Sequence, residues 1–215
     1  MVREKIKFDQ YKVQGKKREF SVVVVPKQRY LWAYYEDFDN EYEIDGDLTT
    51  YRMLKFATAI LANDPHVIIY LPVGNQELGN HSWGQCHDAV LCRPELQLRR
   101  SEWIRLRRQL NNSHRIQKYV LSYREKPLLD EWEAIEHSAK IHRVWSREKF
   151  EVKTVQDNTV FFALWRETWL RYHRGLVETM RDGAPKYPSR YARGLGWILS
   201  QSLLNELEEE IKRSG

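Results

Sequence analysis

Residues 93–126 combine two kinds of side chain that bind nucleic acids, positive charges and aromatic rings. The segment holds ten lysines and arginines against three carboxylates, with one tryptophan and two tyrosines among them. Clustered cations attract a phosphate backbone, and rings such as Tyr119 or Tyr123 can stack on bases. The candidate phosphate contacts are Arg99, Arg100, Arg105, Arg108, Arg115 and Lys118. We therefore predict a surface that binds RNA or single-stranded DNA in preference to duplex.

The same segment also has an ordinary structural interpretation. Helical spacing from residue 101 to residue 109 places Arg105 and Arg108 on one face. The opposite, apolar stripe consists of Trp103, Leu106 and Leu110. An amphipathic helix with a solvated basic face has this pattern without binding anything. Since the tryptophan belongs to the apolar stripe in either interpretation, the prediction of binding depends mainly on charge.

Seven carboxylates gather between residues 36 and 47, where a divalent metal ion could bind. Asp37 and Asp39 form a D-x-D pair at the end of a predicted strand, so both carboxylates point to one side, as two-metal phosphoryl transfer requires. The spacing does not match a calcium loop, because Tyr42 stands at the glycine position. The pair suits Mg²⁺ or Mn²⁺. The alternative is a solvated acidic loop that repels a second chain at a sheet edge.

Glu151 and Lys153 offer a second candidate for metal-dependent nuclease chemistry. They form an E-x-K triplet on a predicted strand, which places a carboxylate and a lysine on one strand face. Such a site needs a further aspartate, and Asp130 or a more distant residue would have to supply it. A cross-strand ion pair is the structural alternative.

Four side chains that can bind zinc lie within twelve residues: His81, Cys86, His87 and Cys92. None of their gaps matches the C-x-x-C spacing of structural zinc sites. Cys92 ends an apolar run and is expected to be a small buried residue, and the histidines are expected to lie in a loop. The chain also lacks a phosphate-binding glycine loop, a dinucleotide fingerprint and a nucleophile elbow. We therefore predict no resident cofactor, with Mg²⁺ or Mn²⁺ as the alternative.

Composition predicts a globular protein. The chain has 215 residues, of which 42% are apolar and 13% aromatic, and its formal net charge is +5. These values favour one folded domain, with a possible division into a sheet-rich part (1–126) and a helical part (127–215). No apolar run approaches the roughly 18 residues of a membrane span, and the charged start MVREKIKF has no apolar core of a signal peptide. With only two cysteines, both expected to be free thiols, we expect a cytoplasmic protein with no membrane partner.

Hydrophobic periodicity predicts an α+β fold. Strands are expected over 6–11, 20–25, 30–35, 66–71, 88–92, 118–123 and 149–155. Helices are expected to begin near residues 48, 101, 130, 158 and 189. The first 125 residues should build a mainly antiparallel sheet packed by helices, and the C-terminal third should be helical.

Three functions follow from these patterns. The first is a nucleic-acid-binding protein that uses the basic surface in 93–126, with nucleic acid or another polyanion as its partner. The second is a metal-dependent nuclease or another phosphoryl-transfer enzyme. The third is a protein-interaction or regulatory module without catalysis, in which acidic and basic regions bind protein partners. Whether the chain is an enzyme stays open at this level.

Overall fold

The computed structural model describes residues 4–27, 31–36, 41–46, 48–72, 88–112, 117–138, 140–148, 152–156 and 159–181. The strands are β1 (Glu4–Gln14), β2 (Glu19–Val24), β3 (Leu31–Glu36), β4 (Glu41–Gly46), β5 (Val67–Leu71), β6 (Asp88–Cys92), β7 (Gln117–Tyr123), β8 (Val152–Gln156) and β9 (Thr159–Ala163). The helices are α1 (Leu48–Asn63), α2 (Arg100–Asn112), α3 (Glu125–Glu136), α4 (Ile141–Glu148) and α5 (Arg166–Arg181), with a 3-10 turn, η1 (Pro94–Leu96). The predicted α+β class is confirmed.

The described strands form a seven-stranded sheet in the order β7-β1-β2-β5-β6-β9-β8, and β3 and β4 form a separate two-stranded sheet. The pairs β2–β5 and β6–β9 are parallel, and the other neighbours in the large sheet are antiparallel. The sheet is therefore mixed, and the prediction of a mainly antiparallel sheet was wrong. Long connections that contain helices return the chain for both parallel pairs, as parallel strands require.

The sheet also extends beyond the first 125 residues, where we expected it to end. β9 adds to it from a segment that was predicted to be helical, whereas β8 overlaps the strand that was expected over 149–155. The helix expected to begin near residue 158 begins instead at Arg166, because Thr159–Ala163 pairs with β6 and is buried there. The sequence TVFFA is rich in β-branched and aromatic residues, which fit a buried strand. The helix expected near residue 189 lies outside the described residues.

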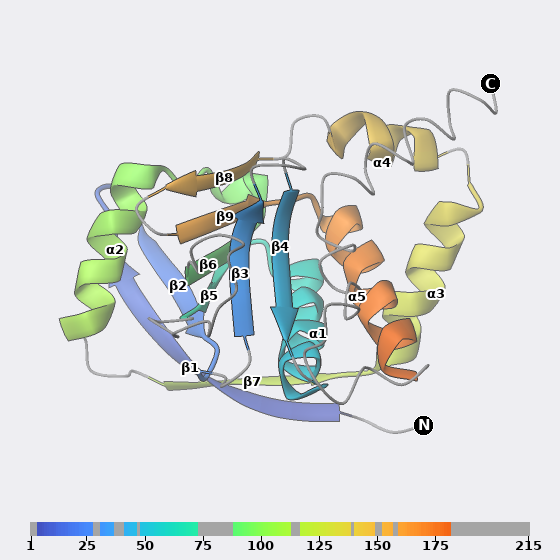
Figure 1. The fold of residues 1–215 in the computed structure, drawn as a ribbon, viewed down its shortest axis with the longest axis horizontal. Coiled ribbons are helices and arrows are strands. Elements are labelled where there is room, and N and C mark those ends of the chain that lie inside the picture. Colours follow the sequence, from blue (N-terminus) through green and yellow to red (C-terminus); the bar gives the residue numbers. More distant parts are fainter. Residues whose placement is uncertain are drawn as a thin grey trace.

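Alternation along the central strands gives the sheet two apolar faces. On β5, Ile69 and Leu71 belong to the core shared with α1 and α5, whereas Ile68 belongs to the core beneath α2. Figure 1 shows the sheet between these layers, with α2 on one side and α1, α5 and α3 on the other. The prediction of a buried strand near the sheet centre is confirmed by β5, which lies fourth in the order of the sheet.

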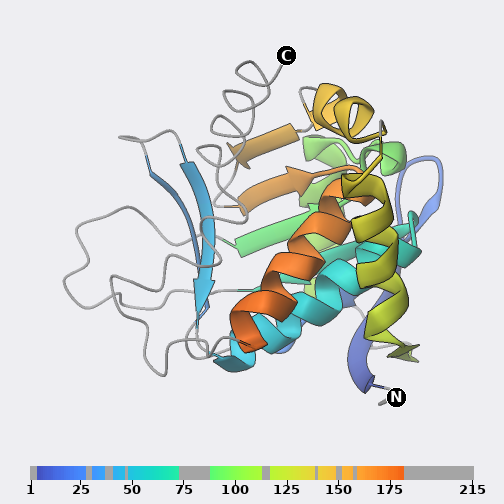
Figure 2. The ribbon, with the colours of Figure 1, turned by 90° about the vertical axis from the view of Figure 1, so that its right-hand side faces the viewer.

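The helices opposite α2 pack in two layers. α1 and α5 lie against the sheet and against each other, and α3 packs outside them on α5 (Figure 2). The β3–β4 hairpin joins this side, since its buried Ala33 and Ile44 belong to the same core. The helix predicted from residue 130 is two helices, α3 and α4, that are separated at residues 137–140. None of the helices in the described ranges is long and apolar enough to cross a bilayer.

Trp169 connects α5 to the sheet. Its ring is fully buried, its Nε1 donates a hydrogen bond to the Cys92 carbonyl at 3.2 Å, and it packs edge-on against Tyr172 at 5.9 Å. This side chain therefore joins a strand end, a helix and the shared core.

We expect Trp169→Ala to lower the free energy of unfolding by about 3–5 kcal/mol, because it leaves a cavity and removes the indole donor. Urea denaturation of purified protein measures the loss. Trp169→Phe is the matched control, since it keeps an aromatic ring and should cost less. A loss below about 1 kcal/mol for the alanine variant would show that the ring does not hold the two layers together.

Candidate functional site

The orientation of α2 on the sheet is set by its apolar stripe. Trp103 and Leu106 are almost completely buried, and the Trp103 ring meets Tyr70 edge-on at 5.2 Å and Phe161 at 6.3 Å. Burial of this stripe turns the other side of the helix toward solvent. Trp103 is therefore a core residue, as its place in the apolar stripe predicted, and it cannot stack on a base.

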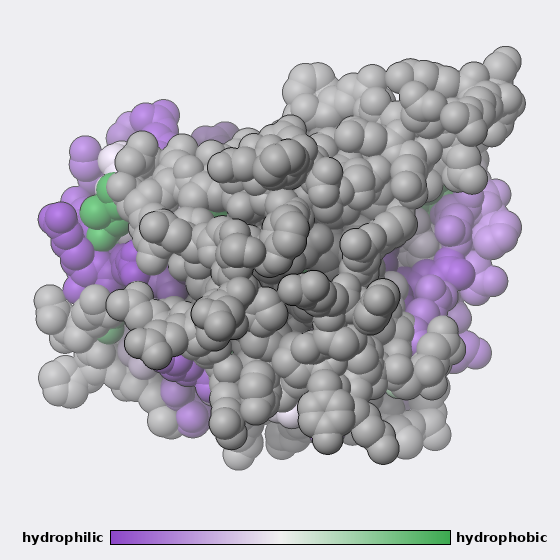
Figure 3. Space-filling view, viewed as in Figure 1, coloured by the Kyte–Doolittle hydropathy of each residue, from purple (hydrophilic) through white to green (hydrophobic). Residues whose placement is uncertain are grey.

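Three of the arginines predicted to bind phosphate lie on the exposed side of this region. Arg99 immediately precedes α2, and Arg105 and Arg108 lie on it one turn apart. All three are exposed, and none forms an ion pair with any residue that the structure describes. Figure 3 shows hydrophilic surface at the edge of the molecule where α2 lies. We name Arg99, Arg105 and Arg108 the α2 basic face.

The other predicted phosphate contacts differ from these three. Lys118 on β7 forms a cross-strand ion pair with Asp9 of β1 at 2.7 Å, so its charge has a partner. The side chain of Arg100 and the whole of Arg115 lie outside the described residues, as do the side chains of Tyr119 and Tyr123. Of the predicted phosphate contacts that the structure describes, those without an ion-pair partner among the described residues are therefore the three of the α2 basic face.

The Arg107 side chain of α2 contacts residues of the sheet. Its Nη2 donates to the Asp88 carboxylate at 2.6 Å, and the Tyr70 hydroxyl donates to the same Oδ2, also at 2.6 Å. Asp88 is buried at the start of β6, and Arg107 Nη1 lies 3.5 Å from the Thr159 hydroxyl at the start of β9. Burial, together with the hydrogen bond to Asp88, raises the pKa of Tyr70 above its usual range, so this phenol stays protonated. The cluster anchors α2 to β5, β6 and β9.

A second basic element, which the sequence analysis did not select, lies alongside α2. Lys16 and Lys17 are exposed in the turn between β1 and β2, and neither forms an ion pair within the described ranges. Two hydrogen bonds join this turn to the α2 region: Gln109 Nε2 donates to the Gln14 carbonyl at 3.1 Å, and the Arg18 guanidinium donates to the Leu96 carbonyl. The K-K-R run beside a glycine was visible in the sequence, but its position next to a helix some 90 residues later was not.

Comparison with models of protein families, with curated proteins and with solved structures finds no match. The function must therefore be argued from the chain's own residues.

The predicted metal sites fall mostly outside the described residues. This applies to Asp37, Asp39 and Glu151, and to the side chain of Lys153 on β8. His81, Cys86 and His87 lie outside as well. The described residues contain no group of three or more histidine, cysteine, aspartate or glutamate side chains that could hold a metal ion. The acidic stretch is partly a strand, because its residues 41–46 form β4 and pair with β3.

Cys92 is a buried thiol at the end of β6. Burial, with a smaller contribution from the nearby Glu95 carboxylate, raises the pKa of Cys92 to about 12. A zinc ligand has to be a thiolate, and this environment disfavours the thiolate. The expectation of a small buried residue is thus confirmed for Cys92.

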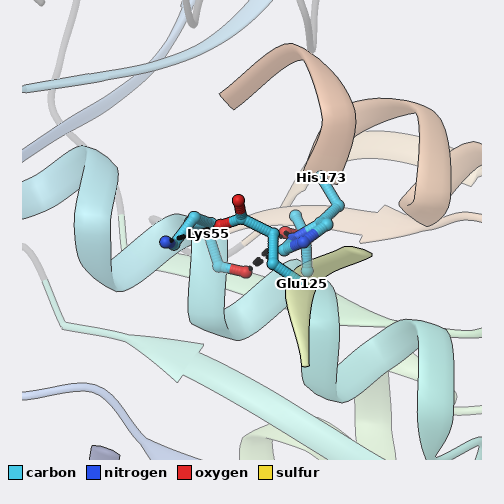
Figure 4. A network of polar contacts seen from close by, with 4 residues as sticks. Lys55, Glu125 and His173 are labelled. Atoms are coloured by element: carbon cyan, nitrogen blue, oxygen red, sulfur yellow. Dashed lines mark hydrogen bonds and ion pairs between the residues drawn. The ribbon is translucent and has the colours of Figure 1, made fainter. Parts of the chain in front are cut away.

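A polar network joins three helices on the opposite side of the sheet (Figure 4). Lys55 of α1, only 5% exposed, donates to Glu125 of α3 at 3.0 Å. His173 of α5 is fully buried, and its Nδ1 lies 3.0 Å from the Lys55 carbonyl and 3.2 Å from the Thr58 hydroxyl. The network links α1 to α3 through an ion pair and α1 to α5 through the histidine.

The partners of His173 determine its tautomer. The Lys55 carbonyl can only accept, so the proton of the neutral ring lies on Nδ1. The Thr58 hydroxyl also donates to this carbonyl, at 2.9 Å, and can accept from Nδ1. Burial lowers the pKa of His173 to about 4, against a smaller raising effect of the bond to the Lys55 carbonyl. His173 is therefore a neutral structural donor at neutral pH.

We expect His173 to make the protein less stable as the pH falls from about 6.5 to about 4. In this window the unfolded chain binds a proton that the folded chain excludes, so the free energy of unfolding falls by on the order of 1.4 kcal/mol per pH unit. His173→Asn retains an N–H donor and does not titrate. Urea denaturation at a series of pH values should show a flatter dependence for this variant, and equal slopes would contradict the assignment.

Proposed function

We propose that this protein binds nucleic acid, RNA or single-stranded DNA, through the α2 basic face. The observation that carries the proposal is that Arg99, Arg105 and Arg108 are exposed without a carboxylate partner among the described residues. An arginine that already has an ion pair must break it to bind a phosphate, whereas these three need only release counterions. A guanidinium can also bind a phosphate through two parallel hydrogen bonds.

The surroundings of α2 support the same proposal. Arg99 lies at the N-terminal end of α2, where the helix dipole is also positive, so a phosphate there meets two favourable fields. The exposed Lys16 and Lys17 extend the positive charge onto the β1–β2 turn. The preference for single strands comes from the sequence, through Tyr119 and Tyr123 on the edge strand β7.

The double substitution Arg105→Glu with Arg108→Glu should abolish binding of a labelled oligouridine or oligothymidine. It replaces two attractive charges with two repulsive ones on a surface that makes no described ion pairs, so the fold should be unaffected. Fluorescence anisotropy measures the affinity, and the binding of the wild-type protein should weaken steeply as the salt concentration rises. A labelled duplex tests the preference for single strands.

The matched control is Arg52→Glu with Lys140→Glu. Both residues are exposed cations away from α2, on α1 and between α3 and α4, and the pair changes the net charge by the same amount. If the control weakens binding as strongly as the α2 variant, the effect is one of total charge and the proposed surface is wrong. Equal binding by wild type and the α2 variant would also refute it.

A further inference from the structure

We infer that Lys16 and Lys17 form the second half of the phosphate-binding surface, and that Arg18 and Arg107 are positioning residues that hold its two halves together. The inference rests on the proposed function and assigns it a second element. The ligand chemistry is a phosphodiester backbone, which RNA and single-stranded DNA share.

The basic runs 16–18 and 105–108 share one arrangement. In each run, one arginine contacts a neighbouring element of the protein and two other cations are exposed. In the run 16–18, all three residues are exposed, and the two lysines form no ion pair within the described ranges. Arg18 differs in that its guanidinium donates to the Leu96 carbonyl and lies over the Phe20 ring at 4.7 Å. In the run 105–108, the first and last arginines are exposed and have no ion pair with a described residue, whereas Arg107 pairs with Asp88. Both anchors keep a fixed partner, and four cations remain available for phosphate.

The β1–β2 turn is closed by a backbone hydrogen bond and is tightly packed at Gly15. The Gly15 N–H donates to the Arg18 carbonyl at 2.8 Å and closes the turn. A Cβ atom at Gly15 would lie 2.5 Å from the Phe20 ring and 2.8 Å from the Arg18 carbonyl oxygen, so no larger residue fits without a shift. Lys16 and Lys17 therefore start from a closed, packed backbone rather than from a loose loop.

The two contacts between the turn and the α2 region show that these elements run side by side. Arg18 reaches Leu96 just before α2, and Gln14 accepts from Gln109 in its third turn. Because residues four apart share a helix face, Arg105 lies on the same side of α2 as Gln109, toward the turn. The helical angle places Arg107 on the opposite side, where Asp88 holds it. Anchors on both sides thus fix the rotation of α2 relative to Lys16 and Lys17.

Fixed placement matters for affinity. Cations that already lie on one surface bind a backbone without ordering their supporting main chain first, which lowers the cost of association. The number of phosphates that they neutralise sets the dependence of affinity on salt. The salt slope therefore reports whether the turn contributes contacts of its own.

The first experiment removes the charges of the turn. Lys16→Gln with Lys17→Gln should weaken binding of oligouridine and oligothymidine by about tenfold and flatten the plot of log K against log salt by roughly 1.4, beyond any effect of the control Arg52→Gln with Lys140→Gln. If the turn variant binds like its control while Arg105→Glu with Arg108→Glu does not bind, the inference fails and the proposed function stands. If neither variant differs from its control, both fail.

Two further variants test placement while leaving every cation in the chain. Gly15→Ala keeps all charges but displaces the turn, so affinity should fall and the salt plot should flatten. Asp88→Asn removes one negative charge. If net charge alone mattered, this variant would bind more tightly. If the Arg107 anchor matters, the variant should bind more weakly and its plot of log K against log salt should be flatter. Tighter binding by the asparagine variant, or an unchanged salt slope in both variants at temperatures where they are folded, would overturn the role of the anchors.

Discussion

A sheet that is buried on both faces is the constraint on which the rest of the structure depends. Side chains alternate along β5, so Ile68 enters one core and Ile69 the other. Each face then needs its own cover, because one layer of helices cannot reach both. α1 and α5 cover one face, and α2 and η1 are the described elements that cover the other. α2 therefore has to bury Trp103, and its charged side is left in solvent.

The contact between α2 and the sheet shows how a buried carboxylate at the edge of the core is stabilised. A buried carboxylate such as Asp88 is costly unless it is paired, and Arg107 and the Tyr70 hydroxyl both donate to it. Because the Asp88 carboxylate needs a partner, Arg107 is held against the sheet, unlike Arg105 and Arg108. Arg105 and Arg108 form no ion pair with the residues that the structure describes, so the stability of the core and the charge of the surface depend on different side chains of one helix.

On the opposite face of the sheet, buried polar side chains are also paired, here between the three helices α1, α3 and α5. Lys55 is buried with Glu125, and losing one partner of such a pair costs more than the pair contributes, since the other charge is left without compensation. His173 stays neutral because burial disfavours its cation, and its Nδ1 proton joins α5 to α1. This network stabilises the helical layer on the side of the sheet opposite α2. Residues 41–46 of the acidic stretch form the strand β4 on this same side of the molecule, whereas Asp37 and Asp39 lie outside the described residues.

The sequence by itself determined the elements whose periodicity comes from local burial: α1, the amphipathic α2 with Trp103 inside, and the apolar strand β5. It also determined that Arg105 and Arg108 share the exposed side of α2, because helical angle follows from spacing alone. It did not determine the start of α5, since Thr159–Ala163 becomes a strand only by pairing with β6. Nor did it show which basic residues have partners. Asp88 contacts Arg107, and Gln14 at the β1–β2 turn contacts Gln109 of α2, across long separations in the chain. Only the order and direction of the strands bring such residues together.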